Sequence, residues 1–237
     1  MIVPHSGRIA LRKDSVIKNP DTNFTVIVNI DTGPGGTVWP PGEWIAPIKR
    51  LHVSSNVQTI GYIDMDGGKR SKVGVRKDIA TYAGWNMSGI AIHGIYFDRT
   101  PLQDLDDGQA YLKNMSAAVR HEAGFLEPKM VVYGAGAVPH TNMTNYDADI
   151  VVVFEGEYED LPARADTRGK VKALGGTRED YAYIVHSVPA EVTRGGIRKI
   201  VDGLRRDVKW LFVTDQGGDE RYEKCSGRWE EFLSLIW

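Results

Sequence analysis

The chain has 237 residues, which suits one large domain or two small ones, and its 42% hydrophobic and 25% charged residues are typical of an ordinary globular protein. A net charge of −2 gives no support for nucleic acid or a membrane surface as a partner, and no apolar run approaches the roughly 20 residues of a membrane span. The single cysteine, Cys225, excludes an intramolecular disulfide and a cysteine metal cluster.

Eight short apolar segments have the composition of strands, each bounded by turn residues or by a helical pattern. In chain order they are 2–3, 24–31, 57–64, 89–98, 129–134, 149–155, 181–187 and 209–215. Several are continuous apolar runs, most clearly 150–154. Such runs indicate burial on both faces, and hence a parallel sheet covered by helices.

Between the strands, apolar residues recur at helical spacing. This spacing predicts helices over 44–53, 104–123, 194–205 and 228–237, with N-caps at Asp104 and Thr193. Strand and helix alternate throughout, without a linker or a charge block. We therefore predict that residues 1–237 form a single (β/α)8 TIM-type barrel, in preference to an open doubly wound sheet.

Two glycine-rich turns, 33–36 and 134–136, follow strands but lack the spacing of nucleotide-binding loops. We expect both to be tight turns where a ligand can approach the backbone closely. The six histidines show no metal-ligand spacing, and His93, in mid-strand, is expected to be a core residue. We therefore expect no cofactor and no metal.

Two carboxylates end predicted strands: Asp98 ends the fourth and Glu155 the sixth. The carboxyl end of a buried strand is where α/β barrels place their chemistry. Side-chain alternation puts Glu155 on the face of Val151 and Val153. If the faces of both carboxylates point inward, the strand spacing brings their carboxyl groups to roughly 5–9 Å. That range covers retaining and inverting glycosidases alike.

Other polar and aromatic residues at or near the strand ends are candidate substrate-binding groups. They are Asn29, Asp31, Tyr62, Asp64, Arg99, Tyr133, His186 and Asp215. For Asp31, Asp64 and Asp215 the alternative is that each caps the following helix. For the tyrosines the alternative is packing.

Segments in the same order along the chain resemble the spherulin-4 family. They are 24–29, 33–35, 61–62, 95–98, 149–155, His186 and 213–215. The resemblance implies a (β/α)8 barrel and, through glycoside hydrolase family 135, secreted or cell-surface hydrolases. These cleave α-1,4-linked N-acetylgalactosamine or galactosamine in polymers such as galactosaminogalactan. The implied partner is thus a polysaccharide or oligosaccharide. The first residues show no signal-peptide pattern, so we expect either that an export signal was removed or that this member stays inside the cell.

The resemblance also implies an acidic site made of an Asp-Glu pair after the fourth strand and a later Glu. Asp98 and Glu155 match the first and last positions, but Arg99 occupies the middle one. A guanidinium beside Asp98 is expected to depress the pKa of that carboxyl, which suits a nucleophile, stabiliser or base and leaves Glu155 as the acid. Arg99 is also expected to disfavour a cationic galactosamine chain relative to a neutral or anionic glycan. The alternative is a non-catalytic carbohydrate-binding or surface/storage protein that has lost part of its acidic site.

Overall fold

The structure is a computed structural model that describes residues 2–3, 13–101, 107–139, 147–218, 221–224 and 226–236. The expected cap at Asp104 and the single cysteine, Cys225, lie outside these residues.

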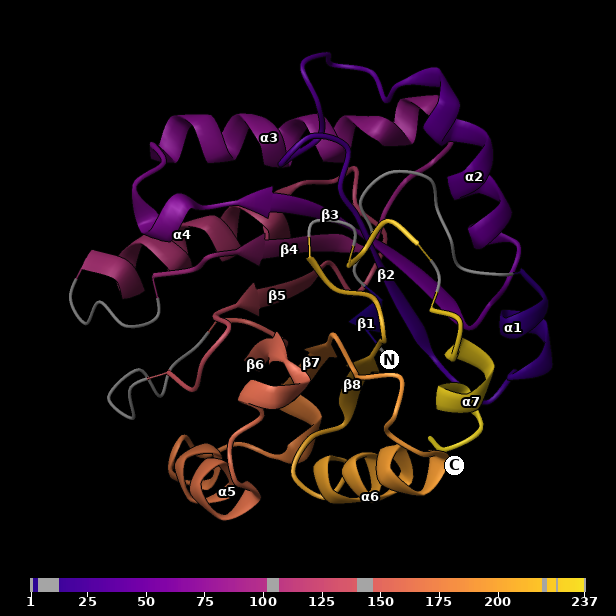
Figure 1. The fold of residues 1–237 in the computed structure, drawn as a ribbon. Coiled ribbons are helices and arrows are strands. Elements are labelled where there is room, and N and C mark those ends of the chain that lie inside the picture. The colour runs from indigo at the N-terminus through magenta and orange to yellow at the C-terminus, as the bar shows by residue number, and fades with distance from the viewer. Residues whose placement is uncertain are drawn as a thin grey trace.

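One curled parallel sheet forms the centre of the molecule (Figure 1). Its strands are β1 (Ile2–Val3), β2 (Phe24–Val28), β3 (Val57–Asp64), β4 (Gly94–Asp98), β5 (Met130–Gly134), β6 (Ile150–Glu157), β7 (Tyr181–His186) and β8 (Trp210–Val213). They follow one another in chain order, and every neighbouring pair is parallel. All residues of β2, β5 and β7 are buried, which confirms the parallel sheet predicted from the continuous apolar runs.

Closure into an eight-stranded barrel is not observed. β1 has only two residues, pairs with β2 and lies near β8. Within the described part of the chain, no hydrogen-bonded pairing joins β8 to β1. The observed fold is therefore an α/β fold with a curled, half-barrel parallel sheet.

Helices cover the outer face of the sheet (Figure 1). They are α1 (Lys13–Lys18), α2 (Gly42–His52), α3 (Lys72–Gly84), α4 (Asp107–His121), α5 (Arg164–Ala173), α6 (Arg194–Leu204) and α7 (Trp229–Leu233). Short 3-10 turns, η1 (Asp66–Gly68), η2 (Trp85–Ser88), η3 (Tyr158–Asp160) and η4 (Arg178–Asp180), complete the described elements.

The helices predicted from apolar spacing correspond to α2, α4, α6 and α7, although α7 is much shorter than expected. The predicted cap at Thr193 is confirmed, since its Oγ1 accepts a 3.2 Å hydrogen bond from the Gly196 amide. Helices α1, α3 and α5 were not predicted. In α3 the exposed Val73 obscures the buried stripe, and in α5 only Thr167 and Val171 are buried.

The fourth strand begins at Gly94 rather than at residue 89 as predicted, because the chain there approaches β5 too closely for a side chain. A Cβ on Gly94 would lie 1.9 Å from the Met130 carbonyl oxygen, and its φ of 146° is one that other residues rarely adopt. His93, just before the strand, is half-buried, and its Nδ1 lies 3.3 Å from both the backbone nitrogen and the carbonyl oxygen of Thr59.

Candidate functional site

A cavity of about 490 Å³ opens at the carboxyl ends of the strands. Its lining residues are Ile27, Asn29, Tyr62, Tyr96, Asp98, Arg99, Gly134, Ala135, Gly136, Glu155, His186, Arg221 and Tyr222. Six of the side chains singled out in the sequence are thereby brought together: Asn29, Tyr62, Asp98, Arg99, Glu155 and His186. This is the end of the sheet where α/β barrels bind their ligands.

Register explains why Asp98 faces the cavity. Asp98 pairs with Gly134 of β5, and two residues earlier Tyr96 pairs with Tyr62 of β3. Registered partners in a parallel sheet share a face, and side chains two residues apart on one strand share it too. Tyr62, Tyr96 and Asp98 therefore form one inward patch, with the two rings stacked at a centroid distance of 6.0 Å.

Glu155 faces the cavity because β6 is irregular, and not for the reason that alternation suggested. Val151 pairs with Tyr133, whose hydroxyl contacts Ser116 of α4, so the Val151 face points outward. Between Val152 and Phe154 the register with β7 shifts by one residue. Phe154 stacks on Tyr183, and the following Glu155 then points inward. The expectation that Glu155 shares a face with Val151 and Val153 is thus wrong, and the bulge re-aims its side chain.

Asp98 is held by one tyrosine. The Tyr62 hydroxyl donates a 2.5 Å hydrogen bond to Asp98 Oδ2. Burial raises the pKa of Asp98, and the Tyr62 hydrogen bond opposes that rise only in part, so the pKa lies above its ordinary value. The charge of Arg99 does lower the Asp98 pKa, but other effects are larger. The expectation of a depressed Asp98 pKa is therefore wrong.

Glu155 is held by two tyrosines. The Tyr222 hydroxyl donates to Oε1 at 2.5 Å, and the Tyr96 hydroxyl donates to Oε2 at 3.3 Å. Burial, and then the charge of Asp98, raise the pKa of Glu155 above its ordinary value. Two carboxyls that are costly to ionise thus share one cavity.

Arg99 turns away from Asp98 and towards the end of β3. Its φ of 48° lies in the left-handed region, and its guanidinium binds both carboxylate oxygens of Asp64 and also Asp66 Oδ1 at 3.2 Å. Burial raises the pKa of Asp64, but the hydrogen bonds from Arg99 and the Asp66 amide outweigh it, so the pKa lies below its ordinary value. The positive charge of Arg99 is therefore compensated by two carboxylates.

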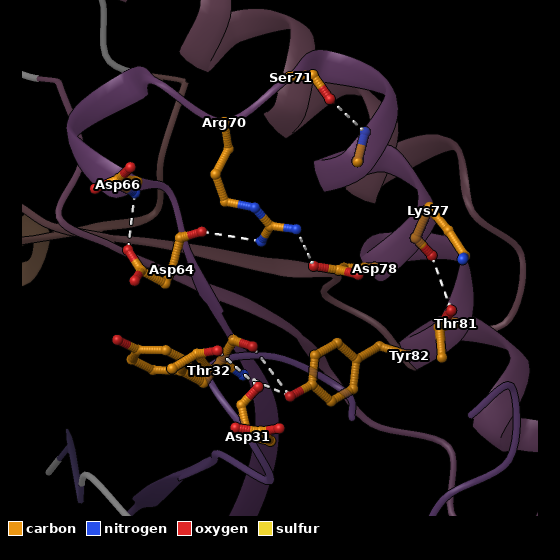
Figure 2. Close-up of polar contacts among 12 residues, drawn as sticks. Asp31, Thr32, Asp64, Asp66, Arg70, Ser71, Lys77, Asp78, Thr81 and Tyr82 are labelled. Carbon is orange, nitrogen blue, oxygen red and sulfur yellow. Dashed lines mark hydrogen bonds and ion pairs between the residues drawn. The ribbon is translucent and has the colours of Figure 1, made fainter. Parts of the chain in front are cut away.

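A polar network anchors the end of β3 to α3, as Figure 2 shows. Arg70 donates to the Asp64 carbonyl at 3.0 Å and to Asp78 Oδ2 at 2.7 Å. The Tyr82 hydroxyl contacts the carbonyl oxygens of Val28 and Tyr62, each at 3.0 Å, and accepts from the Tyr62 amide at 3.2 Å. These bonds fix the backbone that carries Tyr62.

On the opposite wall, His186 and Arg221 lie together. Arg221 Nη1 is 3.3 Å from His186 Nε2, and His186 Nδ1 is 2.9 Å from Ser187 Oγ. A guanidinium can only donate, so Nε2 is the acceptor and Nδ1 carries the proton. Burial and then Arg221 lower the pKa of His186, so the imidazole stays neutral.

Four of the expected substrate-binding residues do not line the cavity. Tyr133 points outward to Ser116, with the two hydroxyls 2.5 Å apart, because its position on β5 alternates with that of Gly134. The Asp64 carboxylate is bound by Arg99, Asp31 is exposed, and Asp215 Oδ1 accepts from the side-chain Nε2 of Gln216 at 2.9 Å. None of the three acids is the N-cap of a described α-helix, although Asp64 accepts from the Asp66 amide at 2.8 Å.

Sequence reasoning missed Tyr96, Arg221 and Tyr222 as site residues. Tyr96 was detectable, because it shares a strand face with Asp98. Arg221 and Tyr222 follow β8 in a segment without periodicity, so no local pattern places them over the cavity.

Backbone strain is concentrated on this rim. Of the five described residues other than glycine with a positive φ, four follow the ends of β2, β3, β4 and β7: Thr32, Asp66, Arg99 and Ser187; the fifth, Lys129, precedes β5. Such conformations cost on the order of 1–3 kcal/mol each and tend to occur at functional sites.

The fold and this rim define the class: an α/β protein with two partly buried carboxylates in a cavity at the strand ends. The chain belongs to the spherulation-specific family 4 (Spherulin4), whose family model matches residues 4–236. The structure of Aspergillus clavatus Sph3 in complex with GalNAc is similar, with a TM-score of 0.89 and 31% identity over 100% of this chain and 96% of that one.

More distant structures share the fold alone. A Bacteroidetes-affiliated GH5 cellulase has a TM-score of 0.59 at 11% identity, over 99% of this chain and 89% of that one. The active domain 2 of a Pyrococcus furiosus chitinase has a TM-score of 0.57 at 12% identity, over 99% and 92%. Among curated proteins no match is found.

Two further findings concern partners. Within the described ranges, no group of three or more His, Cys, Asp or Glu side chains is placed to hold a metal ion. No helix that the structure describes is both long and apolar enough to cross a bilayer.

Proposed function

We propose that this protein is a glycoside hydrolase that cleaves α-1,4-linked N-acetylgalactosamine or galactosamine in polysaccharides of the galactosaminogalactan type. The observation that carries the proposal is the pair of partly buried carboxylates with raised pKa values, Asp98 and Glu155, which line one cavity at the strand ends. Family membership and the similarity to a protein crystallised with GalNAc support the substrate class. We also infer that β8 and β1 complete a (β/α)8 barrel, since the two strands lie near each other.

Glu155 is the proposed general acid. Burial and the negative charge of Asp98 both favour its protonated form, which is the form that a general acid needs. Asp98 is the proposed ionised partner, because the Tyr62 hydroxyl stabilises its carboxylate. Glu155 gives its proton to the glycosidic oxygen, while Asp98 stabilises the positive charge on the sugar, attacks the anomeric carbon or activates water.

Asn29, Tyr62, Arg99 and His186 are the proposed substrate contacts among the cavity-lining residues. The support for this role is most direct for Asn29. Its buried Oδ1 has no hydrogen-bond partner within the described residues, and a sugar hydroxyl would satisfy it.

The test is the release of reducing ends from acetylated and de-N-acetylated galactosaminogalactan. We expect Asp98→Asn and Glu155→Gln each to lower the rate by about 10²–10⁴-fold, the range for loss of a general acid or base. Tyr133→Phe is the matched control, because Tyr133 lies outside the cavity. Unchanged cleavage in both acid variants would show that the site is wrongly assigned.

The second candidate is a non-catalytic carbohydrate-binding protein. It is favoured by one observation: Arg99 stands where the family resemblance implies a Glu. Binding of the polysaccharide without release of reducing ends would support this candidate. A gain of hydrolysis by Arg99→Glu would show that the missing acid is the reason.

A further inference from the structure

Five polar side chains gather in the cavity, and hydrogen bonds join them in two groups, Tyr62 with Asp98, and Glu155 with Tyr96 and Tyr222. The Tyr62 hydroxyl binds Asp98 Oδ2, and the Tyr222 hydroxyl binds Glu155 Oε1, both at 2.5 Å. Each carboxyl group thus has one oxygen fixed by its own tyrosine. Of the two remaining oxygens, Glu155 Oε2 accepts from the Tyr96 hydroxyl, and Asp98 Oδ1 lies with that hydroxyl beside Gly134.

Gly134 creates the space in which these groups meet. A Cβ on Gly134 would lie 2.3 Å from the Tyr96 hydroxyl oxygen and 3.0 Å from Asp98 Oδ1. Both oxygens therefore lie so close to the Cβ position of Gly134 that a side chain there would crowd them. The Tyr96 hydroxyl is bound to Glu155 Oε2 at 3.3 Å, a long hydrogen bond, whereas the other two tyrosine bonds are short.

We propose that the Tyr96 hydroxyl is a shared donor that alternates between Glu155 Oε2 and Asp98 Oδ1, so that the two carboxyls hold one proton as a coupled pair. Tyr96 is thus a positioning residue that acts through the two carboxyls. The coupling itself stands on the geometry, while its use in catalysis rests on the proposed function.

The proton balance follows from what each group can donate. When Glu155 is ionised, Tyr96 donates its O–H to Oε2. When Glu155 takes up a proton on Oε2, that oxygen becomes the donor, so Tyr96 accepts from it and turns its own O–H to Asp98 Oδ1. Once Glu155 has delivered its proton to a leaving group, the Tyr96 O–H returns to Oε2. The phenol stays neutral throughout, because burial and the two carboxylates raise the pKa of Tyr96 well above its ordinary value.

Other charged groups act on the pair from neighbouring elements. Asp64, at the end of β3, raises the pKa of Asp98, and the charge of Arg99, the next residue in the chain, lowers it. Arg221, beside Tyr222, lowers the pKa of Glu155. The backbone amide of Arg99 also donates a hydrogen bond to the Asp98 carboxyl, which lowers its pKa.

The experiment is a titration of the full chain by NMR, with ¹³C-labelled Asp and Glu carboxyls, in wild type and Tyr96→Phe. A shared donor stabilises the singly ionised pair most. Loss of this donor should therefore raise the lower apparent pKa of the pair by about one pH unit without raising the upper one. The difference between the two apparent pKa values should thus become smaller. Tyr133→Phe, which removes another buried hydroxyl outside the cavity, should change neither value.

Two other outcomes would overturn the proposal. If Tyr96 serves Glu155 alone, only the upper apparent pKa rises. If Tyr96 merely excludes water, both values fall towards the ordinary carboxyl range.

A measurement on the wild type alone tests the proposal even if Tyr96→Phe fails to fold. With ¹³Cζ-labelled tyrosine, the Tyr96 resonance should shift at the lower apparent pKa, and a shift only at the upper one contradicts sharing. Neither readout needs a substrate. A protein that shows the coupling but cleaves no glycan would therefore refute the proposed function and leave this inference standing.

Discussion

Tyr62 and Asp98 lie on neighbouring strands, with Asp98 two residues beyond Tyr96, the registered partner of Tyr62, and a 2.5 Å hydrogen bond joins the phenol to the carboxylate. This bond favours the charged form of Asp98, as the bond from Tyr222 does for Glu155. Loss of the Tyr62 hydroxyl should therefore change the pH profile of activity more than the stability of the fold.

Replacement of Tyr62 by Phe removes a donor to the ionised form of Asp98. The pKa of Asp98 should rise further, by about one pH unit, because a hydrogen bond to a charged group is worth about 1.5–3 kcal/mol. The acidic limb of the pH–activity profile should therefore move to higher pH. An unmoved limb with a uniformly lower rate would show that Tyr62 only packs against Tyr96.

The carboxyls of Asp98 and Glu155 should destabilise the folded protein at neutral pH. Both have pKa values raised on folding, so the native state binds more protons than the unfolded chain, and stability falls as pH rises from about 4 through the raised values. Asp98→Asn and Glu155→Gln should each raise the free energy of unfolding at pH 7, by about 0.5–2 kcal/mol. Denaturant unfolding at pH 7 and near pH 4 is the measurement, and the gain should shrink at the lower pH. Equal gains at both values would contradict the raised pKa values.

Gly134→Ala tests the space between Tyr96 and Asp98. The added Cβ would lie 2.3 Å from the Tyr96 hydroxyl oxygen, so the side chains must move apart. We expect a loss of about 1–3 kcal/mol in stability, typical of overpacking, together with loss of sugar binding in calorimetry. The control is Gly169→Ala at an exposed position of α5, where the added Cβ meets no neighbouring atom and binding should be unchanged. Gly136→Ala is less suitable, because the φ of 66° at Gly136 would strain an alanine.

Arg99 should contribute little to stability. Its side chain is 55% exposed, and exposed ion pairs are worth about 0–1 kcal/mol. Arg99→Ala should cost no more than that. Because the pKa of Asp64 is lowered in the fold, this contribution is present above the unfolded pKa of about 4 and is lost as the pH falls through the folded pKa.

The same substitution leaves Asp64 and Asp66 without their cation. Relative binding of de-N-acetylated, cationic chains should therefore increase in Arg99→Ala, as competition between the two polymers would measure. An unchanged or lower ratio would contradict this account of the charges around Arg99.

The strand order and the helical covering follow from features that act locally. Continuous apolar runs require burial on both faces, and the cap at Thr193 is a local hydrogen bond. That Asp98 points inward was also within reach of the sequence, because β4 is regular to its end.

Glu155 shows where such reasoning fails. Strict alternation puts it on the outward face of Val151, and only the one-residue register shift against β7 turns it inward. Nothing in a run of valines marks the position of a bulge, because it depends on pairing with another strand. Tyr222 was missed for a similar reason: its partner, Glu155, lies 67 residues away in the chain.

The most direct test of the central claim is a paired measurement on Glu155→Gln with acetylated galactosaminogalactan: binding by calorimetry and release of reducing ends. We expect binding within a few-fold of wild type and cleavage lower by about 10²–10⁴-fold, since the amide fills the same space but has no proton to give. Cleavage at the wild-type rate by this variant would contradict the account.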